Sequence, residues 1–318
     1  MNTKITQEEI NVGVDTGKHQ LDIYIRPLDI YFTVPNDEKG ISKAISEIKK
    51  HQPTRIIIEA TGRLEHAFIL ACSKANLPFV VANPLHIKKF AGAIGRLAKT
   101  DRLDAGLIAH YGESIKPKLS LLKPDKIRTM SDLLSRRRQL TTMQTMEKNR
   151  LKIMPKRLSS LINPILTVIK NQLIKVDKKL LNLIEECPEY HEKNEILQSM
   201  PGIGNVVAFS LLADMPELGS ISSKEAAALL GVAPFNRESG SYKGQRRIKG
   251  GRYQVRTVMF MAMMSAIQCN PVFKHKYEQL LAQGKPKKLA IIACVRKMIV
   301  ILNSMLRDGV KWEVDYAK

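Results

Sequence analysis

Several common features are missing from this chain of 318 residues. No CxxC or Cys/His spacing indicates a zinc site, because the four cysteines lie far apart, at positions 72, 187, 269 and 294. No segment is expected to span a bilayer, since the apolar run at 258–267 is short and begins beside Arg256. The sequence shows no signal peptide, internal repeat or low-complexity tract. We therefore expect a protein of the reducing cytoplasm, without a membrane partner.

Acidic residues are also scarce, because 30 Asp and Glu stand against 51 Lys and Arg, a formal net charge of +21. This excess favours a polyanionic partner, with nucleic acid first and an anionic membrane surface second. The charge is uneven: residues 121–180 hold 15 basic and 4 acidic side chains. With 44% hydrophobic residues the chain can form real cores, and its length predicts two or three domains.

The N-terminal region, residues 1–122, alternates between strand and helix patterns. Apolar strand patterns cover 10–18, 21–25 and 30–34, and two more cover 54–62 and 78–83. Helical patterns cover 41–50, 64–76 and 84–95. Three strands followed by alternating helices and strands predict an α/β domain with a mixed sheet.

From Pro124 the pattern becomes helical, and two segments, 125–153 and 158–186, are separated by Pro155. In the second segment apolar residues recur at spacings of three and four: Leu161, Ile165, Ile169, Leu173, Val176, Leu180 and Ile184. Such a stripe packs against another helix, of this chain or of a partner. We expect residues 123–192 to form a connecting or dimerising helical hairpin. Its basic segment "SRRRQL" fits either a nucleic-acid contact or a solvated face.

The remaining residues, 193–318, are predicted to form a helical domain. Its "MPGIG" segment lies between helical stretches and fits a helix-hairpin-helix, in which backbone N–H groups near Gly202 and Gly204 bind phosphate. A glycine turn that touches no ligand fits the same letters. The basic excess favours DNA.

Four carboxylates are candidates for a metal site. Asp15 ends the first strand, Glu59 ends the buried strand "RIIIE", and Asp101 and Asp104 share a face at the start of a helix. If they converge, their repulsion requires a cation, and hard oxygen ligands suit Mg²⁺ or Mn²⁺. Asp101 as a helix N-cap and Glu59 as an ordinary turn residue are the alternatives. "GVDTG" also occurs in actin-like sugar kinases, but the second phosphate loop of such kinases is missing here.

The segment "RESGSYKGQRRIKGGR", residues 237–252, holds Ser239 and Ser241 without a histidine and with the single carboxylate Glu238. A serine hydroxyl needs activation before it attacks, so the activator must come from elsewhere in the protein. Six basic residues are expected to contact phosphates: Lys243, Arg246, Arg247, Lys249, Arg252 and Arg256. A loop that only clamps phosphates would have the same composition.

Together these blocks resemble the DEDD transposases of insertion sequences, a family that includes Piv-type invertases and bridge-RNA-guided recombinases. "GVDTGK", "IIIEATG", "AKTDRLDAGLIA", "MPGIG" and "LLGVAPFNRESGSYKGQRRIKGGR" carry the resemblance over nearly the whole chain. It implies a RuvC-like, ribonuclease-H-type domain that holds Mg²⁺ or Mn²⁺ with Asp15, Glu59, Asp101 and Asp104. Thr16 and Gly17 depart from the family, which often has a small hydrophobic residue and then serine or alanine there.

The resemblance further implies a recombinase that cuts and rejoins donor and target DNA through a phosphoserine linkage. The nucleophile would be Ser239, which precedes a glycine, with Ser241 as the alternative. A structured guide RNA, a composite site and a dimer or tetramer in a bacterial or archaeal cytoplasm are also implied. A RuvC-like junction nuclease that uses water, and a non-catalytic nucleic-acid-binding remnant, are the competing readings.

Overall fold

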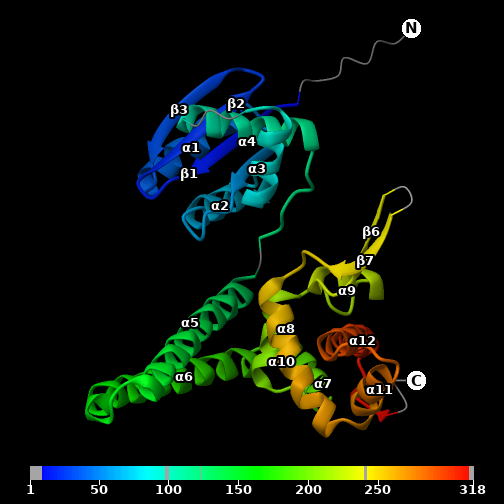
Figure 1. Ribbon diagram of the computed structural model, residues 1–318. Coiled ribbons are helices and arrows are strands. Elements are labelled where there is room, and N and C mark those ends of the chain that lie inside the picture. The colour runs from blue at the N-terminus through cyan, green and yellow to red at the C-terminus, as the bar shows by residue number, and fades with distance from the viewer. Residues whose placement is uncertain (1–8, 97–99, 123, 240–241, 315–318) are drawn as a thin grey trace. The chain divides into compact units, whose positions relative to one another are not determined.

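The computed structural model describes residues 9–96, 100–122, 124–239 and 242–314, and for residues 237, 238, 242, 243 and 245 it describes the backbone alone. The chain divides into two compact units, Met1–Lys123 and Pro124–Lys318, each with its own core (Figure 1). The helical segments of residues 124–192 belong to the second unit. A separate role for 123–192 as linker or dimerisation region stays a prediction.

A five-stranded sheet forms the centre of the first unit. Strands β1 (Asn11–Thr16), β2 (Gln20–Arg26) and β3 (Ile30–Pro35) are antiparallel neighbours, and β4 (Arg55–Glu59) and β5 (Phe79–Ala82) continue the sheet parallel to β1. The strand order is β3-β2-β1-β4-β5. The predicted α/β domain with a mixed, ribonuclease-H-type sheet is therefore confirmed.

Helices cover both faces of this sheet. Helices α1 (Glu38–Lys50) and α2 (His66–Lys74) pack their apolar residues, such as Ile48 and Phe68, on one face. On the other face lie α3 (Pro84–Ala93) and α4 (Asp101–Ile115). A Cβ added to Gly13 would come within 2.1 Å of the Ala105 carbonyl oxygen, so α4 rests directly on the backbone of β1.

The second unit is mainly helical, which confirms the predicted class of this region. Its helices are α5 (Asp125–Ile153), a short 3₁₀ helix (Lys156–Leu158), α6 (Ser159–Glu185), α7 (Pro188–Gln198), α8 (Asn205–Asp214), α9 (Ser223–Leu230), α10 (Tyr253–Cys269), α11 (Pro271–Ala282) and α12 (Lys287–Asp308). Helices α5 and α6 pack on each other as a long antiparallel hairpin whose tip lies away from the other helices of the unit (Figure 1).

The predicted apolar stripe of α6 is buried in one part only. Ile169, Val176 and Leu180 lie in the core of the unit, whereas the side chain of Leu161 is 67% exposed and that of Ile165 is 46% exposed. Near the tip, the described elements beside α6 are α5 and the short 3₁₀ helix (Lys156–Leu158), and these do not cover the whole stripe. The stripe therefore leaves an apolar surface near the hairpin tip.

Helices α7 and α8 with their connecting turn form the predicted helix-hairpin-helix. Gly202 has φ +103, and a Cβ there would come within 2.6 Å of the Ala266 Cβ on α10. Packing inside the unit thus explains the glycine at 202. At Gly204, the residue before α8, an added Cβ would meet no described atom within 4 Å. The side of the turn at Gly204 is open.

Helix α12 corrects the expectation that no segment is long and apolar enough to span a bilayer. Its 22 residues meet that test by length and composition. Many apolar residues of α12, including Val295, Met298 and Leu302, are buried in the core of the second unit. The core helix of a folded unit also passes this test of length and composition, and the burial of α12 is typical of such a helix.

The serine segment, which the sequence predicted as a loop, is a β-hairpin. Strands β6 (Pro234–Ser239) and β7 (Tyr242–Ile248) pair in an antiparallel manner, with an irregularity between Phe235 and Arg237. The side chains of Phe235, Arg246 and Ile248 are all exposed. A ribbon that is exposed to this degree needs no alternation of apolar and polar residues, so the usual strand signal is missing.

Candidate active site

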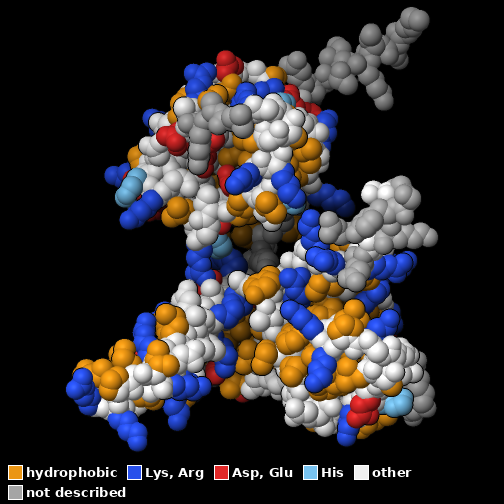
Figure 2. All heavy atoms as spheres, in the orientation of Figure 1, with side chains coloured by type: hydrophobic (Ala, Val, Ile, Leu, Met, Phe, Trp, Pro, Cys, Tyr) orange, Lys and Arg blue, Asp and Glu red, His pale blue; other side chains and the backbone are white. Residues whose placement is uncertain are grey.

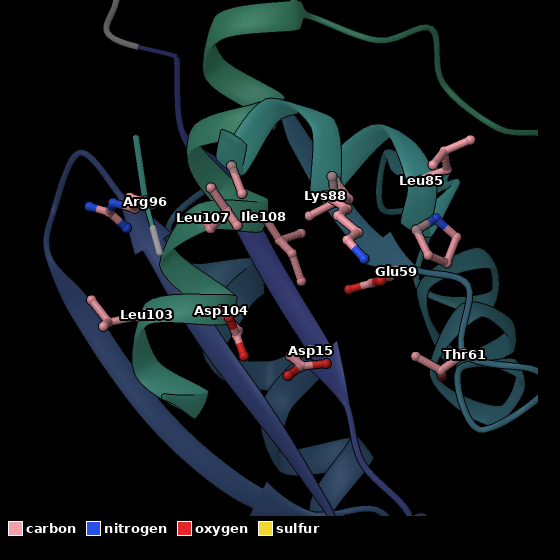
Figure 3. A pocket seen from close by; sticks show the side chains of 13 residues that line it. Asp15, Glu59, Thr61, Leu85, Lys88, Arg96, Leu103, Asp104, Leu107 and Ile108 are labelled. Carbon is pink, nitrogen blue, oxygen red and sulfur yellow. The ribbon is translucent and has the colours of Figure 1, made fainter. Parts of the chain in front are cut away.

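Three of the four predicted carboxylates line one cavity of about 810 Å³ in the first unit (Figure 3). Asp15 comes from the end of β1, Glu59 from the end of β4 and Asp104 from the first turn of α4. Apolar residues of α3 and α4 form much of the remaining wall. The sequence pattern thus led to residues that the fold brings to one place.

The strand pairing explains why Asp15 and Glu59 meet. β1 and β4 are parallel, with Val14 opposite Ile58, so the next residue of each strand is Asp15 and Glu59. Asp15 lies two residues after Gly13, on the sheet face that α4 covers. Thr100 caps α4 through a bond from the Leu103 N–H to its Oγ1 of 3.3 Å, and the first turn of α4 then carries Asp104 into the cavity.

Asp101 takes a different position. It is the first residue of α4 and is exposed, and it is not among the described residues that line the cavity. Thr100 is the N-cap, so the alternative role of Asp101 as N-cap is not the one the structure shows. Burial raises the pKa of Asp15, and the negative charges of Asp104, Asp22 and Asp101 raise it further. Asp101 therefore still contributes to the field at Asp15.

The cavity fits a hard divalent cation in the kind of donor that it offers. Carboxylate oxygens are the ligands that Mg²⁺ and Mn²⁺ prefer, and like charges gathered around Asp15 favour a cation between them. Within the described part of the chain, however, no three Asp, Glu, His or Cys side chains lie close enough together to hold one ion as they stand. The donors face one space without forming a closed cage.

Two basic residues of the cavity were missed by the sequence reasoning. Lys88 of α3 and Arg96, which follows that helix, line the same space. In Figure 3 the amine of Lys88 points toward the carboxylate of Glu59. The available signal was the position of α3, which directly follows a strand that ends beside Glu59. The cavity thus offers positive charge as well as carboxylates to a phosphate ligand.

A hydrogen-bonded turn borders the cavity. Thr16 and Thr61 share a hydrogen bond of 2.5 Å between their hydroxyl oxygens, and Thr61 lines the cavity. The buried carboxylate of Glu65 accepts from the backbone N–H of Thr61 at 3.2 Å and from that of Arg63 at 2.9 Å. Thr16, which departs from the family pattern, therefore joins the ends of β1 and β4.

We expect the Asp15→Asn variant to unfold at a higher temperature than the wild type at pH 7 without divalent cations. Because the folded-state pKa of Asp15 is raised, its ionisation destabilises the fold as the pH rises through that pKa, and the neutral amide avoids this cost. Thermal unfolding over a pH series measures the difference. It should vanish at acidic pH, where the carboxyl group is protonated; an equal difference at all pH values would contradict this origin.

The second unit presents Ser239 at the end of its hairpin. Ser239 is the last residue of β6, is exposed and is paired with Tyr242 of β7. Ser241, the alternative nucleophile, lies outside the described residues, as does Gly240. The hydroxyl of Ser239 is thus accessible at the end of a two-stranded ribbon.

Two of the predicted phosphate-binding arginines hold the base of this hairpin. The guanidinium of Arg252 donates two bonds of 2.6 Å to Glu217 and one of 2.8 Å to the Asp214 carbonyl oxygen. Arg256 donates to the carbonyl oxygens of Gly231 at 3.0 Å and Gly250 at 2.7 Å. These bonds give both arginines a structural role, and their contact with phosphate stays a prediction.

The other predicted basic residues lie along the hairpin itself. Arg246 and Arg247 of β7 are exposed, as is Lys249, which follows the strand. Lys243 lies on β7 opposite Glu238 of β6. The exposed side chains of Arg246, Arg247 and Lys249, and the open turn at Gly204, can bind a phosphate without breaking any ion pair that the structure shows among the described residues.

Comparison with known proteins identifies the family. Two family models match the chain: one for DEDD transposases, described as "Transposase", over residues 12–156, and one described as "Transposase IS116/IS110/IS902 family" over residues 194–278. The chain belongs to the DEDD transposases of insertion sequences. The first match covers the strands and helices that carry the carboxylates, and the second covers the helix-hairpin-helix and the serine hairpin.

Relatives of this transposase include proteins of similar length. The pilin gene-inverting proteins of Moraxella bovis and Moraxella lacunata are each 28% identical over 312 residues, which cover 94% of this chain and 96% of theirs. A 43.6 kDa protein of insertion element IS110 from Streptomyces coelicolor is 29% identical over 150 residues, 46% of this chain and 36% of that protein. Among solved structures, RuvC of Thermus thermophilus matches 35% of this chain and 99% of that one, with 12% identity and a TM-score of 0.26.

As a transposase, the protein is an enzyme that cleaves and rejoins DNA strands, and DNA is its partner. Its first unit supplies an acidic cavity and its second unit supplies an exposed serine among basic residues. These two features are the candidates for its chemistry.

Proposed function

We propose that this transposase cuts and rejoins donor and target DNA with Ser239 as nucleophile, and that Asp15, Glu59, Asp101 and Asp104 hold Mg²⁺ or Mn²⁺ for the reaction. The observation that carries the proposal is the cavity of the first unit, where carboxylates from β1, β4 and α4 face one space. Bound Mg²⁺ would polarise the scissile phosphate and stabilise the charge that develops on it. Asp101 lies outside the cavity lining among the described residues, so as a ligand it has to turn toward the others.

The serine step conserves the energy of the phosphodiester. The Oγ of Ser239 forms a bond to phosphorus, the bond from phosphorus to a deoxyribose oxygen breaks, and the serine proton is lost while the leaving oxygen gains one. A hydroxyl of another DNA end then attacks the phosphoserine, which restores the serine and joins two strands. This suits strand exchange, which needs rejoining without an external energy source. The serine and the carboxylates, from one chain or from two, must act on the same phosphate.

The exposed side chains of the hairpin fit DNA backbone contacts. We expect the double variant Arg246→Gln/Arg247→Gln to bind DNA of any sequence more weakly. The slope of log K against log salt concentration should become shallower by about two, because each phosphate contact contributes about one. Fluorescence anisotropy over a salt series measures the slope. Lys311→Gln, which removes an exposed lysine that pairs with Glu195 at 3.1 Å, is the control. An unchanged slope in the double variant rules out phosphate contacts there.

The α5–α6 hairpin supports the proposal of a homo-oligomer, a dimer or tetramer. Apolar side chains gather on the hairpin with Lys and Arg around them (Figure 2). Leu161, Val168 and Ile174 of α6 are each more than half exposed. Beside them, a groove between α5 and α6 is lined by Leu140, Met143, Ile165 and Val168 among others. A second chain that packs on this surface would bury it.

A structured guide RNA is part of the proposal as well. The net charge of +21 supports a second polyanion beside DNA, and the family resemblance supplies the idea of a guide. We place the reaction in the cytoplasm, with the DNA of the cell.

The decisive experiment incubates the protein with Mg²⁺, DNA and the structured RNA transcribed beside its gene. A covalent protein–DNA adduct, detected as a band that protease removes, is expected together with joined strands. Clean hydrolysis without an adduct would instead identify a junction nuclease that uses water. Binding without any cleavage would identify a non-catalytic remnant.

A further inference from the structure

A fifth carboxylate, which the family motif does not include, lies beside the proposed metal site. Asp22 of β2 is directly opposite Asp15 in the antiparallel pair, so both side chains lie on the sheet face that α4 covers. Asp22 is only 4% exposed. Its Oδ1 accepts a bond of 2.8 Å from the Tyr31 hydroxyl, and its Oδ2 accepts one of 3.0 Å from Gln20 Nε2. Each carboxylate oxygen of Asp22 thus has a hydrogen-bond donor from a side chain of β2 or β3.

The first turn of α4 is attached to β2 and β3 through Arg102. This residue lies between Asp101 and Asp104 in the sequence. Its guanidinium lies 5.6 Å from the ring centre of Tyr31 and 6.0 Å from that of Tyr24, and its Nη2 is 3.3 Å from Asp29 Oδ1. Two cation–π contacts and one ion pair of Arg102 therefore hold this turn, with its carboxylates, against β2 and β3.

Tyr31 takes part in both connections. Its hydroxyl binds Asp22 opposite Asp15, and its ring supports Arg102 next to Asp104. Burial raises the pKa of Tyr31 to about 12, together with the hydrogen bond to Asp22 and the charges of Asp22 and Asp101, against the effect of Arg102. The hydroxyl consequently stays protonated, and remains a donor, at neutral pH.

We propose that Tyr31 is a positioning residue that sets the β1 carboxylate and the α4 carboxylates of the proposed site relative to each other. The inference rests on the proposed metal role of those carboxylates. Without the hydroxyl, Asp22 loses one of its two donors in a buried position, so its negative charge is held less firmly opposite Asp15. Without the ring, Arg102 loses one of the two aromatic side chains that hold the turn with Asp101 and Asp104.

The test compares Tyr31→Phe, which removes the hydroxyl, with Tyr31→Leu, which removes the ring as well. Mn²⁺ binding by the full-length protein is measured by isothermal titration calorimetry, beside strand cleavage at saturating Mg²⁺. We expect Mn²⁺ affinity to fall about 10-fold in Tyr31→Phe and up to about 100-fold in Tyr31→Leu, as for other residues that orient metal ligands. DNA affinity should stay at the wild-type value, because Tyr31 is in the acidic site and not in the basic hairpin.

Tyr24→Phe is the matched control. Tyr24 also lies beside Arg102, but its hydroxyl donates to Asp29 and not to Asp22. This variant keeps the aromatic ring beside Arg102 and both residues of the Arg102–Asp29 ion pair, and the hydroxyl that it removes does not contact Asp22, so Mn²⁺ affinity should stay within about twofold of the wild type. An equal loss in Tyr24→Phe and Tyr31→Phe would overturn the specific role of Tyr31.

A double-mutant cycle locates the effect of the hydroxyl. If Tyr31 acts through Asp22, Tyr31→Phe should cause no further loss of Mn²⁺ affinity in an Asp22→Ala background. Independent, additive losses would overturn the proposal, and so would a lower unfolding temperature of Tyr31→Leu with unchanged Mn²⁺ affinity. If Tyr31→Leu does not fold, Tyr31→Phe and the cycle decide alone. Loss of Mn²⁺ affinity in Asp15→Asn but in neither Tyr31 variant refutes this inference and leaves the metal site standing; no loss in Asp15→Asn refutes the metal site itself.

Discussion

Replacing Ser239 by alanine is expected to remove the covalent protein–DNA adduct and to lower strand exchange by at least about 1,000-fold. The side chain is exposed at the end of β6, so its removal should leave the fold of the second unit unchanged. DNA binding should persist, because the exposed arginines of β7 remain in place. Adduct formation on a radiolabelled DNA substrate, beside anisotropy for binding, measures both quantities.

Ser241→Ala is the matched control for this prediction. This variant removes a serine hydroxyl two positions further along the chain, and we expect it still to form the adduct. If Ser241→Ala loses the adduct and Ser239→Ala keeps it, Ser241 and not Ser239 is the nucleophile. Clean DNA cleavage by Ser239→Ala without any adduct would identify water as the nucleophile and support the junction nuclease.

The second large effect is expected from the carboxylates. Asp15→Asn and Asp104→Asn should each reduce strand cleavage by at least about 1,000-fold, because charge stabilisation by a bound metal supplies several kcal/mol. Both side chains line the cavity, and the amide keeps their shape while it removes the charge. Binding of DNA and RNA should survive in both variants. Cleavage assays over a Mg²⁺ series, with binding measured in the same buffer, check this.

Glu113→Gln provides the comparison on the same helix. Glu113 also lies on α4, but its carboxylate accepts a bond of 2.8 Å from Arg26. This variant should retain cleavage close to the wild-type rate. Excess EDTA should stop exchange by the wild-type protein; exchange that continues undiminished in EDTA would refute the metal role of the carboxylates.

Much of the first unit was predictable because its signals are local. Two strand patterns end at Asp15 and Glu59, and Asp101 and Asp104 lie three positions apart on a helix. The sequence alone therefore predicts these four carboxylates as one group. The structure then separated Asp101 from the other three, since its exposed position at the start of α4 depends on how that helix lies on the sheet. The spacing of apolar residues along α4 does not determine how the helix lies on the sheet.

Other features escaped because they depend on contacts between distant residues. In the sequence, Asp22 is one polar residue within an apolar strand pattern. The pairing of β1 with β2 brings it opposite Asp15. The basic segment predicts that Arg252 contacts phosphate. In the structure its guanidinium donates to Glu217 and to the Asp214 carbonyl oxygen at the base of the hairpin. The strands β6 and β7 carry no apolar alternation, and the apolar length of α12 is explained by the core around it.

Composition, strand and helix periods and motif spacing were therefore enough to predict the class of the fold and the candidate residues, and the resemblance of whole sequence blocks indicated the family, since each is written in neighbouring letters. The partners of each side chain were decided by the tertiary structure alone. Register across β1, β2 and β4, and the close approach of α4 at Gly13, choose which carboxylates share a cavity and which are bound elsewhere. Charge and hydrogen bonding act over a few ångströms in space, and that distance has no counterpart in the order of residues along the chain.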